Sequence, residues 1–314
     1  MKLQTQIPLQ PQQHNQIDYN SKIVLLGSCF SEYIGAKFHY NKFQSLVNPF
    51  GILFHPKAIE TLMSNAVGNK IYSDGDVFLN NEQWHCYDAH SKLSNTSKNY
   101  LINQLNEQIY LTSSKLKRAS HIIITLGTAW VYRDIKTDSI VANCHKVPQK
   151  LFKKELLSVQ EITNSLKNIL SLIRSVNNDV LVVFTVSPIR HTKDGFVQNT
   201  QSKAHLITAI HQVINNKSFY FPSFEIMMDE LRDYRFYNED MIHPNQVAIN
   251  YIWDKFKTVW ISDESFKVME EVDTIQKGLK HKPFNLKSQA HQKFLQNLEA
   301  KKNQIHSHFP HIVF

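Results

Sequence analysis

Two patterns of apolar and polar positions alternate along the chain. Short apolar runs, typical of strands buried on both faces, cover residues 22–26, 43–47, 121–126, 180–186 and 218–221. Longer stretches with apolar residues at every third or fourth position are typical of helices with one buried face. They cover residues 31–40, 56–66, 99–116, 159–176, 201–214 and 246–259.

This alternation predicts an α/β fold, a flavodoxin-like three-layer α/β/α sandwich around a parallel sheet of about five strands. In such a sheet the loops and helix N-termini gather beyond the carboxyl ends of the strands, so we expect the functional residues there. Two longer polar segments, residues 72–97 and 132–152, are expected to be insertions that wall the site.

Composition places the chain among soluble globular proteins, because 42% of its 314 residues are hydrophobic and 20% are charged. Residues 1–16 contain no apolar core of the length a secretory signal needs, and no apolar run approaches the roughly 20 residues that cross a bilayer. We therefore expect a cytoplasmic protein without a membrane partner. Three widely separated cysteines predict reduced thiols rather than a disulfide framework or a zinc site.

The net charge of +8 comes mostly from the C-terminal end. From Lys277 onward the sequence contains seven lysines and one acidic residue, Glu299, which together account for +6. We predict a main α/β domain over residues 1–260 and a basic helical appendage over residues 261–314. A solvated helix face is the favoured explanation of the lysines, so a nucleic-acid partner is not expected. The histidines near the C-terminus lack acidic or thiol neighbours, and no metal site is predicted.

Ser28 follows the first predicted strand and a glycine, and it stands where the first helix begins. A helix N-terminus presents unpaired N–H groups and partial positive charge, which would stabilise an oxyanion formed by attack of this serine. A simpler role for Ser28 is to cap the helix. A nucleotide cofactor is not expected, because Gly27 and Gly35 stand alone without a three-glycine fingerprint.

Asp240 and His243 lie three residues apart, just ahead of Pro244 and the last helix of the α/β region. One loop can therefore position both side chains. The carboxylate would fix the tautomer of the imidazole, and the free ring nitrogen would take a proton from a serine hydroxyl. Asp-x-x-His alone is a weak motif, since both residues can simply cap a helix. The combination with a serine after the first strand is far more specific.

Six long strings between residues 20 and 260 resemble the GSCFA family, within the SGNH (GDSL-like) hydrolase superfamily. They are GSCF (27–30), NPFGILFHP (48–56), TLGTAWVYR (125–133), NCHKVP (143–148), SPIRH (187–191) and DELRDYRFYNEDMIHP (229–244). The resemblance implies a serine esterase that cleaves O-acyl esters, such as O-acetyl groups on carbohydrate, through a Ser-His-Asp triad and an acyl-enzyme. An acyltransferase with the same triad and a catalytically silent ligand-binding module remain alternatives.

The resemblance makes Ser28 the nucleophile and Asp240 and His243 the other triad members, with the N–H groups of Ser28 and Gly51 as donors to the oxyanion. The superfamily's third block usually supplies an asparagine as a further donor, but here Ala129 occupies that position. Losing one such donor typically costs about a hundredfold or more in rate. Either Thr128, Asn143 or another group substitutes, or the activity is weak or specialised.

Cys29 competes with its neighbour for the role of nucleophile, because a thiol is the better nucleophile at neutral pH. Adjacent residues in a helical turn point in different directions, so we expect Cys29 to turn into the core when Ser28 faces the cleft. A small-molecule or carbohydrate ester is the expected partner, and the oligomeric state is not predicted. Candidate substrate-binding residues are Asn48, Asn143, His145, Arg190 and His191.

Overall fold

The central sheet contains five parallel strands in the order β10-β9-β5-β1-β2, in a computed structural model that describes residues 5–314. The first four residues, with which the predicted main α/β domain begins, lie outside the described residues. The order reverses between β1 and β5, as in flavodoxin-like sheets. The strands are β1 (Lys22–Gly27), β2 (Gln44–Val47), β5 (His121–Leu126), β9 (Leu181–Val186) and β10 (Ser218–Tyr220). The predicted fold class and its strands are confirmed.

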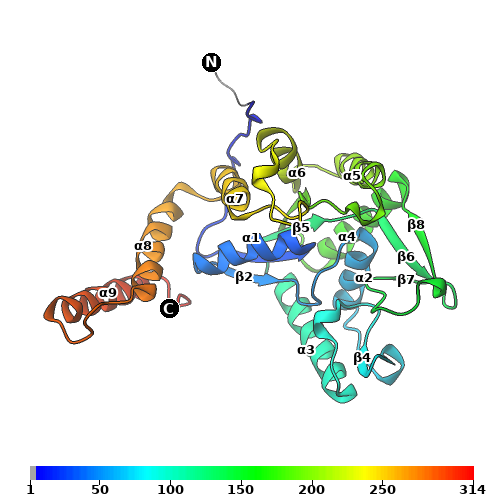
Figure 1. Ribbon diagram of the computed structural model, residues 1–314, viewed down its shortest axis with the longest axis horizontal. Coiled ribbons are helices and arrows are strands. Elements are labelled where there is room, and N and C mark those ends of the chain that lie inside the picture. The colour runs from blue at the N-terminus through cyan, green and yellow to red at the C-terminus, as the bar shows by residue number, and fades with distance from the viewer. Residues whose placement is uncertain (1–4) are drawn as a thin grey trace.

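Helices cover both faces of this sheet (Figure 1). Alternate side chains of β1 point to opposite sides: Val24 and Leu26 join one core cluster, and Ile23 and Leu25 join the other. The first cluster includes α2 (Pro56–Val67), α3 (Lys98–Leu116), α4 (Val159–Val176) and α5 (Phe196–His211), and the second includes α1 (Cys29–Tyr40) and α7 (Gln246–Trp260).

Two helices differ most from the prediction. α5 begins at Phe196, five residues before the predicted start, because Gly195 at φ 111° turns the chain directly into the helix. α8 (Asp263–Lys280) lies in the predicted helical appendage but was not predicted as a separate helix. Its buried apolar side chains, Met269, Val272 and Ile275, form a narrow stripe within a charged sequence, which weakens the helical pattern.

Both predicted insertions carry antiparallel strands. Residues 72–97 contain the hairpin of β3 (Phe78–Asn80) and β4 (Gln83–His85). Residues 132–152 belong largely to a second sheet, in which β6 (Trp130–Asp134) pairs with β7 (Ile140–Val141) and with β8 (Phe152–Leu156).

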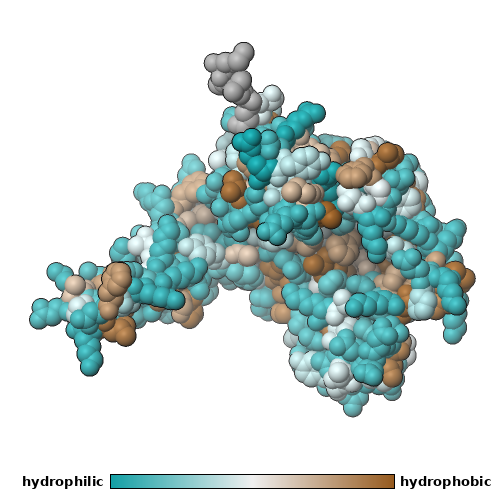
Figure 2. Space-filling model, in the orientation of Figure 1, coloured by the Kyte–Doolittle hydropathy of each residue, from teal (hydrophilic) through white to brown (hydrophobic). Residues whose placement is uncertain are grey.

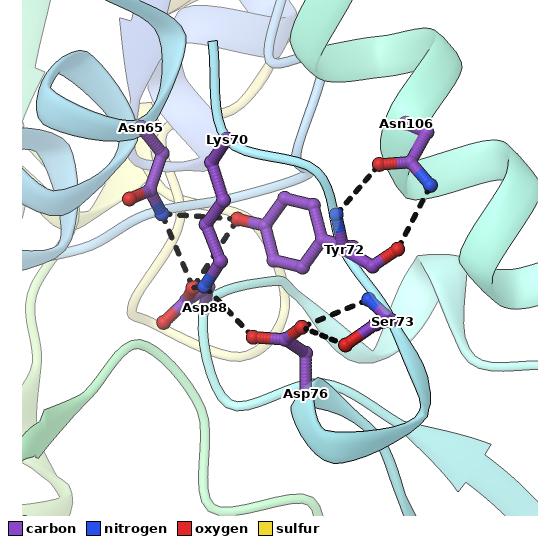
Figure 3. Close-up of polar contacts among 7 residues, drawn as sticks. All are labelled: Asn65, Lys70, Tyr72, Ser73, Asp76, Asp88 and Asn106. Atoms are coloured by element: carbon purple, nitrogen blue, oxygen red, sulfur yellow. Dashed lines mark hydrogen bonds and ion pairs between the residues drawn. The ribbon is translucent and has the colours of Figure 1, made fainter. Parts of the chain in front are cut away.

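A polar network fastens the first insertion to the helices beside it (Figure 3). The carboxylate of Asp88 accepts hydrogen bonds from Lys70 at 3.1 Å, from the hydroxyl of Tyr72 at 3.2 Å and from Asn65 of α2 at 3.2 Å. Asn106 of α3 bonds both the N–H and the carbonyl of Tyr72, at 2.7 and 3.0 Å. Every member has partners within the network, which indicates a structural role.

α8 and α9 (Gln289–His308) form an arm that leaves the main body (Figure 1) and is mostly hydrophilic on its surface (Figure 2). The base of the arm contacts α1: the hydroxyl of Tyr40 donates to Asp273 at 2.8 Å, and Gln276 donates to the carbonyl of Tyr40 at 3.0 Å. Val272 and Ile275 belong to the same apolar cluster as α1. Among residues 5–314, no helix has the length and apolar character needed to span a membrane.

Ile275→Ala tests whether α8 is packed on the α/β core. The side chain is fully buried, so its truncation should lower the free energy of unfolding by about 2–4 kcal/mol. Leu279→Ala, one turn later at a side chain 47% exposed, is the matched control and should change it by no more than about 0.5 kcal/mol. Urea denaturation gives both values. Equal, small effects would show that the arm contributes no stabilising contact.

Candidate active site

Ser28 lies in the tight turn between β1 and α1, at the point where the sheet order reverses. Gly27 has a φ of 127°, and a Cβ at this residue would lie 2.0 Å from the carbonyl oxygen of Thr125 in β5. Only glycine therefore allows the two strand ends to approach so closely. The N–H of Ser28 donates to the same carbonyl at 3.0 Å. This turn thus lies at the edge of the sheet where ligand crevices form in such folds.

The hydroxyl of Ser28 caps α1 in this conformation. The residue is fully buried, and its Oγ accepts a hydrogen bond from the N–H of Phe30 at 3.3 Å. This is the capping role that the sequence left open beside the catalytic one. The bond is long, and rotation about the Cα–Cβ bond would release the hydroxyl for another partner.

Asp240 and His243 form a hydrogen-bonded pair in the loop before α7. One carboxylate oxygen of Asp240 accepts the N–H groups of Ile242 and His243, both at 2.9 Å, and the other lies 2.6 Å from Nδ1 of His243. The hydrogen bonds from the two N–H groups, with that from the ring, lower the pKa of Asp240 to about 2. The carboxylate is therefore ionised at neutral pH, so it holds the proton on Nδ1 and leaves Nε2 free to act as a base.

The imidazole of His243 reaches the first turn of α1, where its nearest hydrogen-bonding partner is Cys29. Its Nε2 lies 3.9 Å from the sulfur of Cys29. Among residues 5–314, no hydrogen bond joins this ring to Ser28. The expectation that Cys29 turns into the core is met only in part: its side chain packs against the second core cluster but stays partly exposed and within reach of His243. Burial is the main cause that raises the pKa of the Cys29 thiol to about 11, so it is protonated at neutral pH.

Each N–H group expected to form the oxyanion hole already has an acceptor. The N–H of Ser28 bonds β5, as described above, and that of Gly51 donates to the carbonyl of Asn48 at 2.8 Å. The N–H of Thr128 donates to the carbonyl of Phe54 at 3.0 Å. In this conformation, none of the three is free to receive a developing negative charge.

The polar groups of Thr128 and Ala129, in the third block of the superfamily, also have hydrogen-bonding partners. The hydroxyl of Thr128 accepts the N–H of Trp130 at 3.0 Å and lies 3.1 Å from the hydroxyl of Ser202. Ala129 is fully buried, and its N–H donates to Ser202 at 2.7 Å. Thr128 therefore does not replace the missing asparagine in this geometry.

Two buried nitrogen atoms near Ser28 have no hydrogen-bonding partner in the described part of the chain: Nδ2 of Asn48 and Nε2 of His191. The amide of Asn48 is fixed, because its Oδ1 accepts the N–H of Gly27 at 2.9 Å. Unpaired buried polar atoms are rare in native proteins and commonly mark sites that bind a ligand or water. Asn48 and His191 were both predicted to contact substrate, and these atoms are available for that contact.

Gly127 separates His191 from Ser28 at the end of β5. A Cβ at Gly127 would lie 3.2 Å from Nε2 of His191 and 3.3 Å from Cβ of Ser28. A side chain at this position would press on both residues, so glycine is what allows the imidazole and the serine to lie this close. Burial, the charge of Lys203 and that of His243 lower the pKa of His191 to about 3, so its ring is neutral at physiological pH.

Lys203 bonds two strand ends beside the site, and its role was not predicted from the sequence. It is fully buried, and its ammonium group donates to the carbonyls of Gly127 at 2.8 Å and Ser187 at 2.7 Å. Burial lowers its pKa to about 7. The signal was present, since Lys203 shares a helical face with Leu206 and Ile210, three and seven positions later.

Arg190 lies beside the Asp-x-x-His loop. Its N–H donates to the carbonyl of Ile242 at 3.2 Å, and its guanidinium stacks on three aromatic rings at 5.1 to 5.7 Å from their centroids. The rings are those of Phe196, Tyr234 and Tyr237. These contacts hold the loop that carries His243, while the contact of Arg190 with substrate stays a prediction.

A cavity of about 440 Å³ adjoins His191, and neither His243 nor Ser28 is among the residues that line it. Its wall includes residues of the second insertion, as predicted, and Asn143 is among them. His145 is not among the lining residues: it is buried, with the ring of Phe78 edge to face and that of His85 tilted against it, and its Nε2 lies 2.8 Å from the carbonyl of Cys86. Residues lining the cavity include Phe54, Thr128, Trp130, Tyr132, Asn143 and His191.

Comparison with solved structures returns carbohydrate esterases at low identity. A family 3 carbohydrate esterase from Talaromyces cellulolyticus is 10% identical, with a TM-score of 0.38 over 80% of this chain and 99% of that chain. A family 2 carbohydrate esterase from Clostridium thermocellum, in complex with cellohexaose, is 9% identical, with a TM-score of 0.38 over 76% and 63%. An acetyl xylan esterase from the rumen bacterium Butyrivibrio proteoclasticus is 10% identical, with a TM-score of 0.40 over 84% and 66%.

Sequence comparison gives a more specific result. Among proteins with curated descriptions, none matches this chain. The family described as "GSCFA family" matches residues 22–256, and "GSCFA domain protein, C-terminal domain" matches residues 272–314. The first match alone covers the central sheet, the turn at Ser28 and the loop of Asp240 and His243. The chain therefore belongs to the GSCFA family.

Proposed function

We propose that this protein is a serine esterase in which Ser28 is the nucleophile, His243 the general base and Asp240 the residue that orients it. The observation that carries the proposal is the 2.6 Å contact between Asp240 and His243, which leaves Nε2 directed at the first turn of α1. A carboxylate–imidazole pair beside the N-terminus of a helix is suited to activating a hydroxyl for acyl transfer.

The reaction begins when the hydroxyl of Ser28 turns from the N–H of Phe30 toward His243. As Nε2 of His243 takes the hydroxyl proton, Oγ bonds the ester carbonyl carbon, and the tetrahedral intermediate collapses to an acyl-enzyme. The leaving alcohol receives its proton from His243. Water, deprotonated by the same nitrogen, then attacks the acyl-enzyme. His243 returns that proton to Oγ of Ser28 as the carboxylic acid is released.

The substrate class follows from the superfamily resemblance, which implies short acyl groups, such as acetyl on carbohydrate. The cavity beside His191 adds support, because aromatic side chains next to polar groups suit a sugar ring or an acyl group. An acyltransferase would use the same residues and differ only in the acceptor that cleaves the acyl-enzyme.

Cys29 is the rival nucleophile, because its sulfur lies 3.9 Å from Nε2 of His243. The same pair would support a cysteine-dependent acyl transfer. Its thiol gains no advantage from the site, however, since burial raises its pKa to about 11. A useful thiolate requires the opposite shift.

Paired variants separate the two nucleophiles. Ser28→Ala should reduce kcat on short acyl esters by about 10³-fold or more, because the covalent route is lost. Cys29→Ala, the matched control at the adjacent position, should stay within about threefold of the wild type. Loss of the cap costs only about 1 kcal/mol, so circular dichroism should show folded protein in both. The reverse ranking of the two activities would assign the chemistry to the thiol.

Asp240→Asn tests the orienting role of the carboxylate. The amide cannot hold the proton on Nδ1 as an ionised carboxylate does, so kcat should fall by about 10²- to 10⁴-fold with little change in KM. Glu239→Gln removes a charge from the neighbouring exposed residue and should have no such effect. Initial rates over a range of ester concentrations give both constants. If the two variants are equally active, the aspartate has no part in the reaction.

A further inference from the structure

His191 is one of two residues near Ser28 with a buried, unpaired nitrogen that the triad does not use, and Asn48 is the other. The esterase proposal requires a group that stabilises the negative charge on the substrate oxygen after Ser28 attacks. The expected N–H donors are engaged elsewhere, and the third block offers only the methyl group of Ala129. The proposed chemistry therefore needs a donor other than those expected, and the unpaired nitrogens of Asn48 and His191 are the candidates.

We propose that His191, through a hydrogen on Nε2, donates to the oxyanion in place of the missing asparagine. This inference rests on the proposed function and adds one residue to it. Two observations carry it: Nε2 of His191 is buried without a partner, and a Cβ at Gly127 would lie 3.2 Å from that nitrogen and 3.3 Å from Cβ of Ser28. The imidazole and the serine therefore border the same point at the end of β5, beside the carbonyl oxygen of Phe54.

The ring of His191 is held in place by its surroundings. The backbone N–H of His191 donates to Oδ1 of Asn199 at 2.8 Å, and this bond fixes the backbone. Asn199 is itself buried in α5. The imidazole meets the ring of Phe54 edge to face, with centroids 5.5 Å apart. A donor fixed in this way needs no reorganisation when charge develops, which is the condition for effective oxyanion stabilisation.

The charge state of His191 suits a donor rather than a base. The groups that face it are Lys203 and His243, and positive charge on either disfavours protonation of His191. With burial they keep the imidazole neutral at physiological pH, so it would be a weak general base. A neutral imidazole still carries one N–H and can polarise a carbonyl oxygen without becoming charged.

Three variants of the full-length protein test the proposal. His191→Ala should lower kcat on a short acyl ester by about 10²- to 10³-fold with a nearly unchanged KM, because the lost bond forms only in the transition state. His191→Gln retains a side-chain N–H and should recover part of the loss. Thr192→Ala, at the adjacent position, is the control and should behave as wild type. Thermal unfolding should show all three folded.

A boronic acid provides a second readout, because its tetrahedral adduct with Ser28 mimics the oxyanion. Its affinity should fall in His191→Ala by about the same factor as kcat/KM. In the wild type, ¹⁵N NMR of the histidine rings should show neutral His191 with its proton on Nε2, and that signal should shift when the boronic acid binds. If His191 had a purely structural role, neither the affinity for the boronic acid nor the ¹⁵N signal would change in this way.

The outcomes separate failure of this inference from failure of the esterase proposal. If the wild type shows no turnover that depends on Ser28, the proposed function is wrong and the oxyanion role falls with it. If Ser28-dependent turnover is present but His191→Ala stays within about threefold of wild type, only the role of His191 is wrong. It is also overturned if His191→Gln is as inactive as His191→Ala and both shift the acidic limb of the pH–rate profile, since that would make His191 a base.

Discussion

The hydrogen bond from His243 to Asp240 is the interaction on which the site depends. It sets the proton on Nδ1 and directs Nε2 toward the turn after β1. The carboxylate can do this because it is held by two backbone N–H groups of its own loop, which keep it ionised. The fold contributes the position of Ser28: Gly27 lets β1 approach β5 closely at the turn before this residue. The first turn of α1 then lies within reach of His243.

Buried polar groups hold the strand ends on which the site is built. Lys203 bridges the carbonyl groups that end β5 and β9, and Asn48 bonds the N–H of Gly27 from the end of β2. Burying an amine or an amide is costly unless it is hydrogen-bonded, and both make such bonds to the backbone. The atoms left without partners, Nδ2 of Asn48 and Nε2 of His191, are therefore exceptions in a region that is otherwise well paired.

Much of the fold could be predicted from the sequence, because fully apolar strands and amphipathic helices have distinct periods. The central strands were placed to within about one residue, and the loop of Asp240 and His243 was recognisable from its spacing. α8 could not be placed as a separate helix, since its buried stripe is narrow and its sequence is highly charged. The orientation of Cys29 was also beyond the sequence: it depends on the packing of α1 against the loop before α7, not on local preference.

The central claim is that Ser28, and not its neighbour, carries the acyl group, and acid-quenched acyl-enzyme tests it most directly. The wild type would be mixed briefly with p-nitrophenyl acetate, quenched in acid and digested, and the peptide containing residues 28 and 29 sequenced by tandem mass spectrometry. The account predicts an added acetyl group on Ser28. An acetyl group on Cys29, or an unmodified peptide from an enzyme that turns over, would contradict it.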